Sequence, residues 1–131
     1  MGAPDAEAAR AWWVKVESDL DAARVLVESD HPDVAVYLCQ QAAEKALKAL
    51  LTYHAIEFEK THDLTRLLDE GTQVDTSLDS LREAARGLSP YATLYRYPGD
   101  VAFPPPGEAE EALEWAQEVA SAIGIRLRGV L

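Results

Sequence analysis

The sequence predicts an all-α protein, an antiparallel up-and-down four-helix bundle with an additional short helix. Apolar residues recur three and four positions apart over long segments, which is the spacing of one buried helix face. No segment sustains the two-residue alternation of a β-strand, and Pro or Gly lies between the helical segments. Because 131 residues is a single-domain length, we expect one helical domain over 1–131.

The first two helices are expected to be the longest. The first is predicted over 6–29, with an apolar stripe of Trp13, Val16, Leu20, Ala23 and Val27. Pro32 suits the first position of a helix, so the second is predicted over 32–54. Its expected buried residues are Leu38, Ala42, Ala46, Leu47, Leu50 and Leu51, and Cys39 beside them is expected to be a small buried side chain.

Shorter helices are expected in the middle of the chain. Thr61 can cap a third helix over 62–70, and Gly71 is expected to end it. A fourth helix is predicted over 76–88, before Pro90 interrupts the backbone. The residues expected to be buried in these two helices are Leu64, Leu67, Leu68, Leu78, Leu81, Ala85 and Leu88.

The last third of the chain is expected to hold a short helical turn and one long helix. The turn is predicted over 92–95, within an aromatic and proline-rich segment over 91–106. The final helix is predicted over 108–128, since acidic residues gather at its start and Arg126 and Arg128 at its end, as the helix dipole favours.

The composition limits the classes of function. The net charge of −11 argues against a general nucleic-acid surface, although local basic patches can exist. The sequence has no apolar run long enough to span a membrane and no signal peptide, so a cytoplasmic location is expected. The three histidines lack chelating spacings and there is no glycine-rich phosphate loop, so neither a metal nor a cofactor is predicted.

A polar ridge is predicted along the second helix. Its members fall at i, i+3, i+4 and i+7 and are Gln41, Glu44, Lys45 and Lys48. Glu44 and Lys48 have the spacing of an i, i+4 ion pair. The ridge faces either a ligand cleft or a dimer partner, or it is simply a solvated helix edge. Lys48→Ala is expected to change the unfolding free energy by under about 1 kcal/mol.

Two further residues are candidates for binding. His62 lies at the start of a helix, where it can exchange protons near neutral pH or simply cap the helix. Arg96 lies between two tyrosines, Tyr95 and Tyr97, and can grip a phosphate while a ring stacks on a base. The alternative for Arg96 is a structural contact, either with an aromatic ring or with a carboxylate.

Three motifs in order resemble the HEPN family of prokaryotic helical domains. They are QQAAEKALK at 40–48, THDL at 61–64 and LYRYP at 94–98. The resemblance implies a helical protein of the kind often encoded beside a minimal nucleotidyltransferase. It implies a component of a toxin–antitoxin or stress-response pair that binds a nucleotide or that partner enzyme, with a ligand site built from Arg96, Tyr97, His62 and the polar ridge.

Two other functions remain open. The ribonuclease branch of the family is a metal-independent RNA endonuclease that uses an Arg and a following His with four to six residues between them, but no His follows Arg96. The pair Arg24 and His31 matches that spacing early in the chain, where the family motif does not lie, and we interpret it as coincidence. The second alternative is a non-catalytic dimerisation module. A homodimer is expected in any case, because the aromatic side chains of Trp12, Tyr91, Tyr95 and Phe103 are hard to bury in one small bundle.

Overall fold

The computed structural model describes residues 4–98 and 103–131, and all regular secondary structure in these ranges is helical. Predictions that concern residues 1–3 and 99–102, at the N-terminus and inside the aromatic segment, lie outside the described residues. The elements are α1 (Ala6–Glu28), α2 (Pro32–Tyr53), α3 (Leu64–Val74), the 3₁₀ helix η1 (Thr76–Leu81), α4 (Arg82–Leu88), the 3₁₀ helix η2 (Ser89–Ala92) and α5 (Glu108–Arg126). The predicted all-α class is confirmed.

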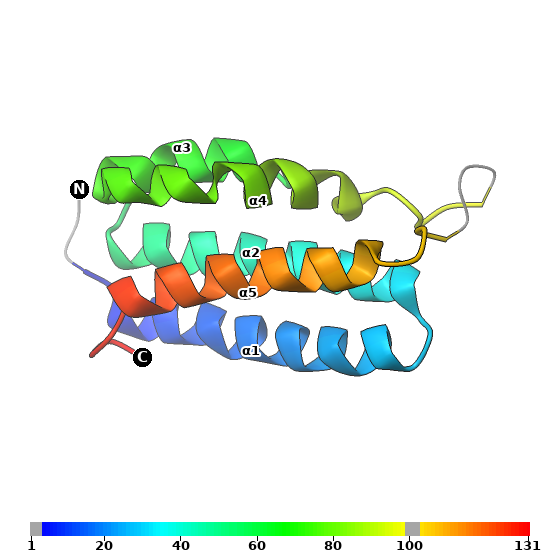
Figure 1. Ribbon diagram of the computed structural model, residues 1–131. Helices are drawn as coiled ribbons and strands as arrows, with labels where there is room; N and C mark the ends of the chain where they lie inside the picture. Colours follow the sequence, from blue (N-terminus) through cyan, green and yellow to red (C-terminus); the bar gives the residue numbers. More distant parts are fainter. Residues whose placement is uncertain (1–3, 99–102) are drawn as a thin grey trace.

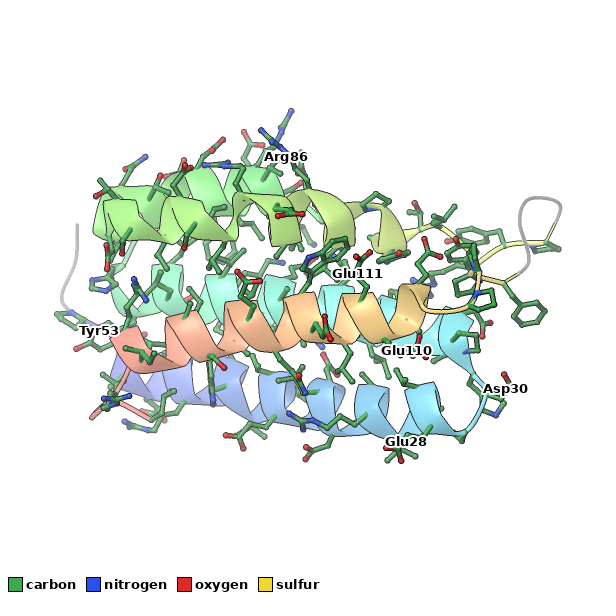
Figure 2. All side chains as sticks on the ribbon, viewed as in Figure 1. Glu28, Asp30, Tyr53, Arg86, Glu110 and Glu111 are labelled. Carbon is green, nitrogen blue, oxygen red and sulfur yellow. The ribbon has the colours of Figure 1, made fainter. Side chains whose placement is uncertain are left out.

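Consecutive long helices run antiparallel (Figure 1). The start of α1 meets the end of α2, where the Asp5 amide donates to the Tyr53 carbonyl at 3.0 Å. Asp30, in the turn that joins these helices, lies at the opposite end of the bundle from Tyr53 (Figure 2). The pair α4 and α5 is antiparallel as well, since Arg126 near the end of α5 bonds Asp75, which precedes η1. The main bundle therefore consists of α1, α2, α4 and α5.

The additional helix α3 forms a hairpin with η1 and α4. The first amide of α3, on Leu64, donates to Ser89 Oγ just beyond α4, at 3.0 Å. Farther along, Arg82 of α4 bonds the Thr65 carbonyl and the Asp69 carboxylate of α3. The start of α3 thus lies beside the end of α4, and a later part of α3 lies beside the start of α4. The two helices are therefore antiparallel, and α3 also packs against α2.

The core lies around α2, which packs against α1, α3 and α5. Most of the buried residues predicted for α2 are fully buried, and Leu38 is half-buried. Cys39 is buried as expected, and burial raises the pKa of its thiol to about 12. The alanines of α2, Ala42, Ala43, Ala46 and Ala49, are all fully buried, which lets the neighbouring helices approach closely.

Two boundaries of α3 differ from the prediction. Asp63 caps the helix, because its carboxylate accepts from the Thr65 amide, while the predicted cap Thr61 accepts from the Asp63 amide one step earlier. Gly71 does not end the helix, which continues to Val74. Gly71 is buried against the core, where helical continuation is favoured by packing rather than by local sequence.

The predicted fourth helix begins as a 3₁₀ helix. Asp75 accepts from both the amide and the hydroxyl of Ser77, and this local bonding starts the tighter 3₁₀ turn that continues to Leu81. The short helical turn expected over 92–95 lies three residues earlier, as η2, because Pro90 occupies its first turn.

The aromatic residues that motivated the homodimer are mostly not exposed. Tyr91 is buried in the core, and Trp12 and Tyr95 are packed against it. Of the four, Phe103 is largely exposed. Trp12, Tyr91 and Tyr95 are covered within a single bundle, so they do not provide the exposed apolar surface from which the homodimer was predicted.

A close approach of α4 and α5 gives a test of the packing. A Cβ built on Gly87 would lie 2.2–2.8 Å from three ring carbons of Trp115. We expect Gly87→Ala to lower the free energy of unfolding by about 1–3 kcal/mol, because the indole would have to move. The control is Gly71→Ala, where the nearest atoms would be 3.8–3.9 Å away and the added methyl fits. Urea unfolding that shows Gly87→Ala to be as stable as Gly71→Ala would contradict this packing.

Candidate functional site

Glu44 is the centre of a buried polar cluster on α2. Its side chain comes from the middle of the helix, and the residue is only 4% exposed. Three groups bond the carboxylate: Gln40 Nε2 at 3.1 Å, Lys48 Nζ at 3.0 Å and His62 Nδ1 at 2.8 Å. The structure therefore joins three of the predicted site residues, Glu44, Lys48 and His62, in one network.

Gln40 is a member of this cluster that the sequence reasoning did not select. Its side chain is fully buried, and its Nε2 donates both to Glu44 Oε1 and to the His62 carbonyl, each at 3.1 Å. One amide group thus holds the carboxylate and the backbone of the histidine together. The sequence did indicate this contact, because Gln40 is four residues before Glu44 and therefore lies next to it on the same face of α2.

The network keeps Glu44 ionised. Burial acts to raise its pKa, but the hydrogen bonds from His62, Lys48 and Gln40 and the charge of Lys48 outweigh burial, so the pKa lies below its ordinary value. At neutral pH the group is a carboxylate, which accepts hydrogen bonds and donates none.

The carboxylate determines which nitrogen of His62 carries the proton. Because Glu44 Oε1 can only accept, the neutral imidazole must donate from Nδ1, which leaves the lone pair on Nε2. The His62 side chain is 67% exposed, so Nε2 is accessible from solvent. The arrangement is a buried carboxylate that orients a surface histidine.

The predicted polar ridge is divided between two sides of α2. Lys48 is only 11% exposed, with its Nζ 5.7 Å from the Trp12 ring centroid and 5.8 Å from that of Phe58. Lys45 turns towards α1, where it pairs with Asp19 at 2.7 Å. Each of the two lysines is paired with a carboxylate, so neither is a free surface cation. Gln41 bonds Gln40 Oε1 at 2.7 Å and remains beside the cluster.

Arg96 lies on the ring of Tyr37. The guanidinium carbon is 4.0 Å from the ring centroid, and Nη1 donates to the Ala92 carbonyl at 3.4 Å. The contact with an aromatic ring that was one alternative for Arg96 is therefore present, and the ring belongs to α2. Beside it is a surface hollow of about 310 Å³, lined by Asp33, Val34, Tyr37, Tyr95 and Arg96.

Tyr95 fixes the direction of the chain at Arg96. Its backbone is left-handed, with φ of 68°, a conformation that is strained for a tyrosine. Its hydroxyl donates to Glu108 at the start of α5, at 2.7 Å, and its ring stacks on Tyr91. Burial, together with Glu108, raises the pKa of Tyr95 to about 12, so the phenol stays protonated. Tyr97, the other predicted aromatic, is exposed.

A family model described as the HEPN domain matches residues 9–126. The chain belongs to the HEPN domain family. The crystal structure of an archaeal HEPN homologue is similar to this chain, with a TM-score of 0.73 and 25% sequence identity, covering 97% of this chain and 99% of that one. No curated protein matches the chain.

The HEPN domain of this chain does not join Arg24 to His31. Arg24 pairs with Asp21 on α1, whereas His31 precedes α2, and no hydrogen bond or ion pair links the two in the described structure. The described part of the chain also contains no group of three or more His, Cys, Asp or Glu side chains placed to hold a metal ion. Within residues 4–98 and 103–131, none of the helices has both the length and the apolar character that crossing a bilayer requires.

Proposed function

We propose that this HEPN domain binds a nucleotide, or a minimal nucleotidyltransferase partner, as one component of a cytoplasmic toxin–antitoxin or stress-response pair. The observation that carries the proposal is Arg96, an exposed residue whose guanidinium carbon lies 4.0 Å from the Tyr37 ring centroid, at the edge of a hollow. A planar guanidinium held by a ring is suited to bidentate contact with phosphate oxygens.

The charge of Arg96 is the important property in a chain with a net charge of −11. Four other arginines, Arg24, Arg66, Arg82 and Arg126, pair with carboxylates. Arg96 makes no such pair among the described residues, although Asp33 lines the same hollow. Among the described residues, an anionic group can therefore approach Arg96 without displacing an ion pair. The adjacent Tyr97 is an exposed ring on which a base or a partner side chain can stack.

Arg96→Ala tests this proposal directly. We expect the substitution to abolish binding of ATP in isothermal titration calorimetry while the melting temperature stays within a few degrees, because the side chain donates one long hydrogen bond to the fold. Arg24→Ala is the control, since it removes the same charge from the exposed surface of α1. The same variants should be compared in binding to a minimal nucleotidyltransferase where the adjacent gene encodes one.

Two outcomes of that experiment would contradict the proposal. The first is equal loss of binding in Arg24→Ala, which would indicate a general effect of charge. The second is a fall in melting temperature for Arg96→Ala with binding intact, which would make Arg96 a structural clamp on Tyr37.

The geometry favours binding over RNA cleavage, because no histidine follows Arg96 and the side chains of Arg24 and His31 do not bond each other.

The homodimer stays a prediction. Its support is now the exposed apolar residues beside Arg96, which are Val34 in the same hollow and Leu94 and Tyr97 next to it in the chain. Light scattering at micromolar concentration is expected to give twice the chain mass, and a monomer mass would contradict it.

A further inference from the structure

We propose that His62 recognises a ribose hydroxyl, so that the site prefers ribonucleotides to deoxyribonucleotides. This inference rests on the proposed nucleotide-binding function and adds the class of nucleotide. Nε2 of His62 would accept a hydrogen bond from the 2′-hydroxyl, while the phosphates of the same ligand contact Arg96.

The acceptor character of Nε2 follows from the groups around Glu44. The carboxylate receives hydrogen bonds from Gln40 and Lys48 as well as from the imidazole. An ionised carboxylate has no proton to donate, so Nδ1 must be the donor in its contact with Glu44. When His62 is neutral, its one ring proton is therefore on Nδ1. A hydroxyl can donate to the remaining lone pair on Nε2, whereas a phosphate oxygen cannot.

The imidazole is held in place before any ligand arrives. Gln40 bonds the His62 carbonyl and the Glu44 carboxylate together. The next two backbone amides are fixed as well, that of Asp63 by Thr61 Oγ1 and that of Leu64 by Ser89 Oγ, each at 3.0 Å. A group that is already ordered loses little conformational entropy when it binds.

The spacing along α2 fits a nucleotide that reaches from Arg96 to His62. Arg96 contacts Tyr37, and His62 contacts Glu44. Tyr37 and Glu44 are seven residues apart on α2, so they lie on the same face of the helix, about 10 Å apart along its axis. This is of the order of the distance between the ribose hydroxyls and the terminal phosphate of an extended nucleoside triphosphate. Between them lies Gln41, whose amide bonds Gln40.

The charges give the ligand a direction. At the Arg96 end a guanidinium is present without a paired carboxylate among the described residues. At the other end the His62 ring has an ionised carboxylate behind it, which disfavours a phosphate there. Phosphates are therefore expected at Arg96, and the uncharged sugar at His62.

The test is calorimetric titration of ATP and dATP into the wild-type protein, His62→Ala and the control His31→Ala. We expect the wild type and His31→Ala to bind ATP about tenfold more tightly than dATP, the effect of one well-placed hydrogen bond. In His62→Ala the ratio should fall to near one while dATP affinity is unchanged. A wild-type ratio of one, or a ratio that persists in His62→Ala, would overturn the inference.

These outcomes separate the inference from the proposed function. If Arg96→Ala abolishes binding but the wild type does not distinguish ATP from dATP, the nucleotide site stands and the role of His62 is wrong. If neither nucleotide binds the wild type, the role of His62 and the nucleotide-binding form of the proposed function are both wrong, and only binding of a nucleotidyltransferase partner stands. Nitrogen NMR of the wild-type imidazole is an independent measurement, since it should show the proton on Nδ1 of neutral His62, and a proton on Nε2 would overturn the inference without any ligand.

Discussion

Replacing Glu44 with alanine is expected to lower the free energy of unfolding by about 3–5 kcal/mol, the range found when one partner of a buried ion pair is removed. The substitution leaves Lys48, only 11% exposed, without its carboxylate. It also removes one of the two acceptors of the fully buried Gln40 amide and frees the His62 ring. Chemical denaturation measures the loss, and a loss under about 1 kcal/mol would mean that the cluster contributes little to the fold.

Glu44→Gln is the matched control, because it keeps the size of the side chain and removes the charge. The two proteins should also differ in acid. Since the folded pKa of Glu44 lies below its ordinary value of 4.5, its contribution is fully present above that value and is lost as the pH falls through the folded pKa. The wild type should therefore lose part of its stability advantage over Glu44→Gln below about pH 4.5. An advantage that does not change with pH would contradict an ionised, stabilising Glu44.

Leu50→Ala is expected to lower the free energy of unfolding by about 2–5 kcal/mol, because it leaves a cavity in a core that α3 and α5 cover. Leu50 is fully buried in α2, and its side chain borders Gly71 of α3. The control is Leu131→Ala, the same change at a residue that is 45% exposed, where the loss should be under about 0.5 kcal/mol. Equal losses in urea unfolding would show that the core around α2 is wrongly described.

The structure changes the expectation for Lys48→Ala. From the sequence we expected Lys48→Ala to change the unfolding free energy by under about 1 kcal/mol, but the side chain is largely buried and is one of three donors to Glu44. Its removal is now expected to cost more than the 1 kcal/mol or so typical of an exposed ion pair. Leu50→Ala should still have the larger effect, because Glu44 keeps its bonds from Gln40 and His62.

The sequence by itself determined the helices and the residues that they bury. The buried sets predicted for α3 and for η1 with α4 are all buried, because a helix repeats every 3.6 residues and the apolar pattern follows that repeat. The pairing of Glu44 with Lys48 was predicted for the same reason, since four residues make about one turn. The family was also indicated by the sequence, because its three motifs keep their order along the chain.

The tertiary structure decided which of these residues meet. The loop before α3 returns along α2, and only that path brings His62 to Glu44, eighteen positions earlier in the chain. Arg96 contacts Tyr37 because the left-handed backbone of Tyr95 and its bond to Glu108 turn the chain towards α2. Lys45 and Lys48 point in different directions because Lys45 pairs with Asp19 of α1, whereas Lys48 pairs with Glu44. The period of the helix determines which face a residue lies on. The residue that it contacts on that face comes from a segment far away in the sequence. The path of the loop that brings this segment there has no periodic pattern, so the contact cannot be predicted from the sequence.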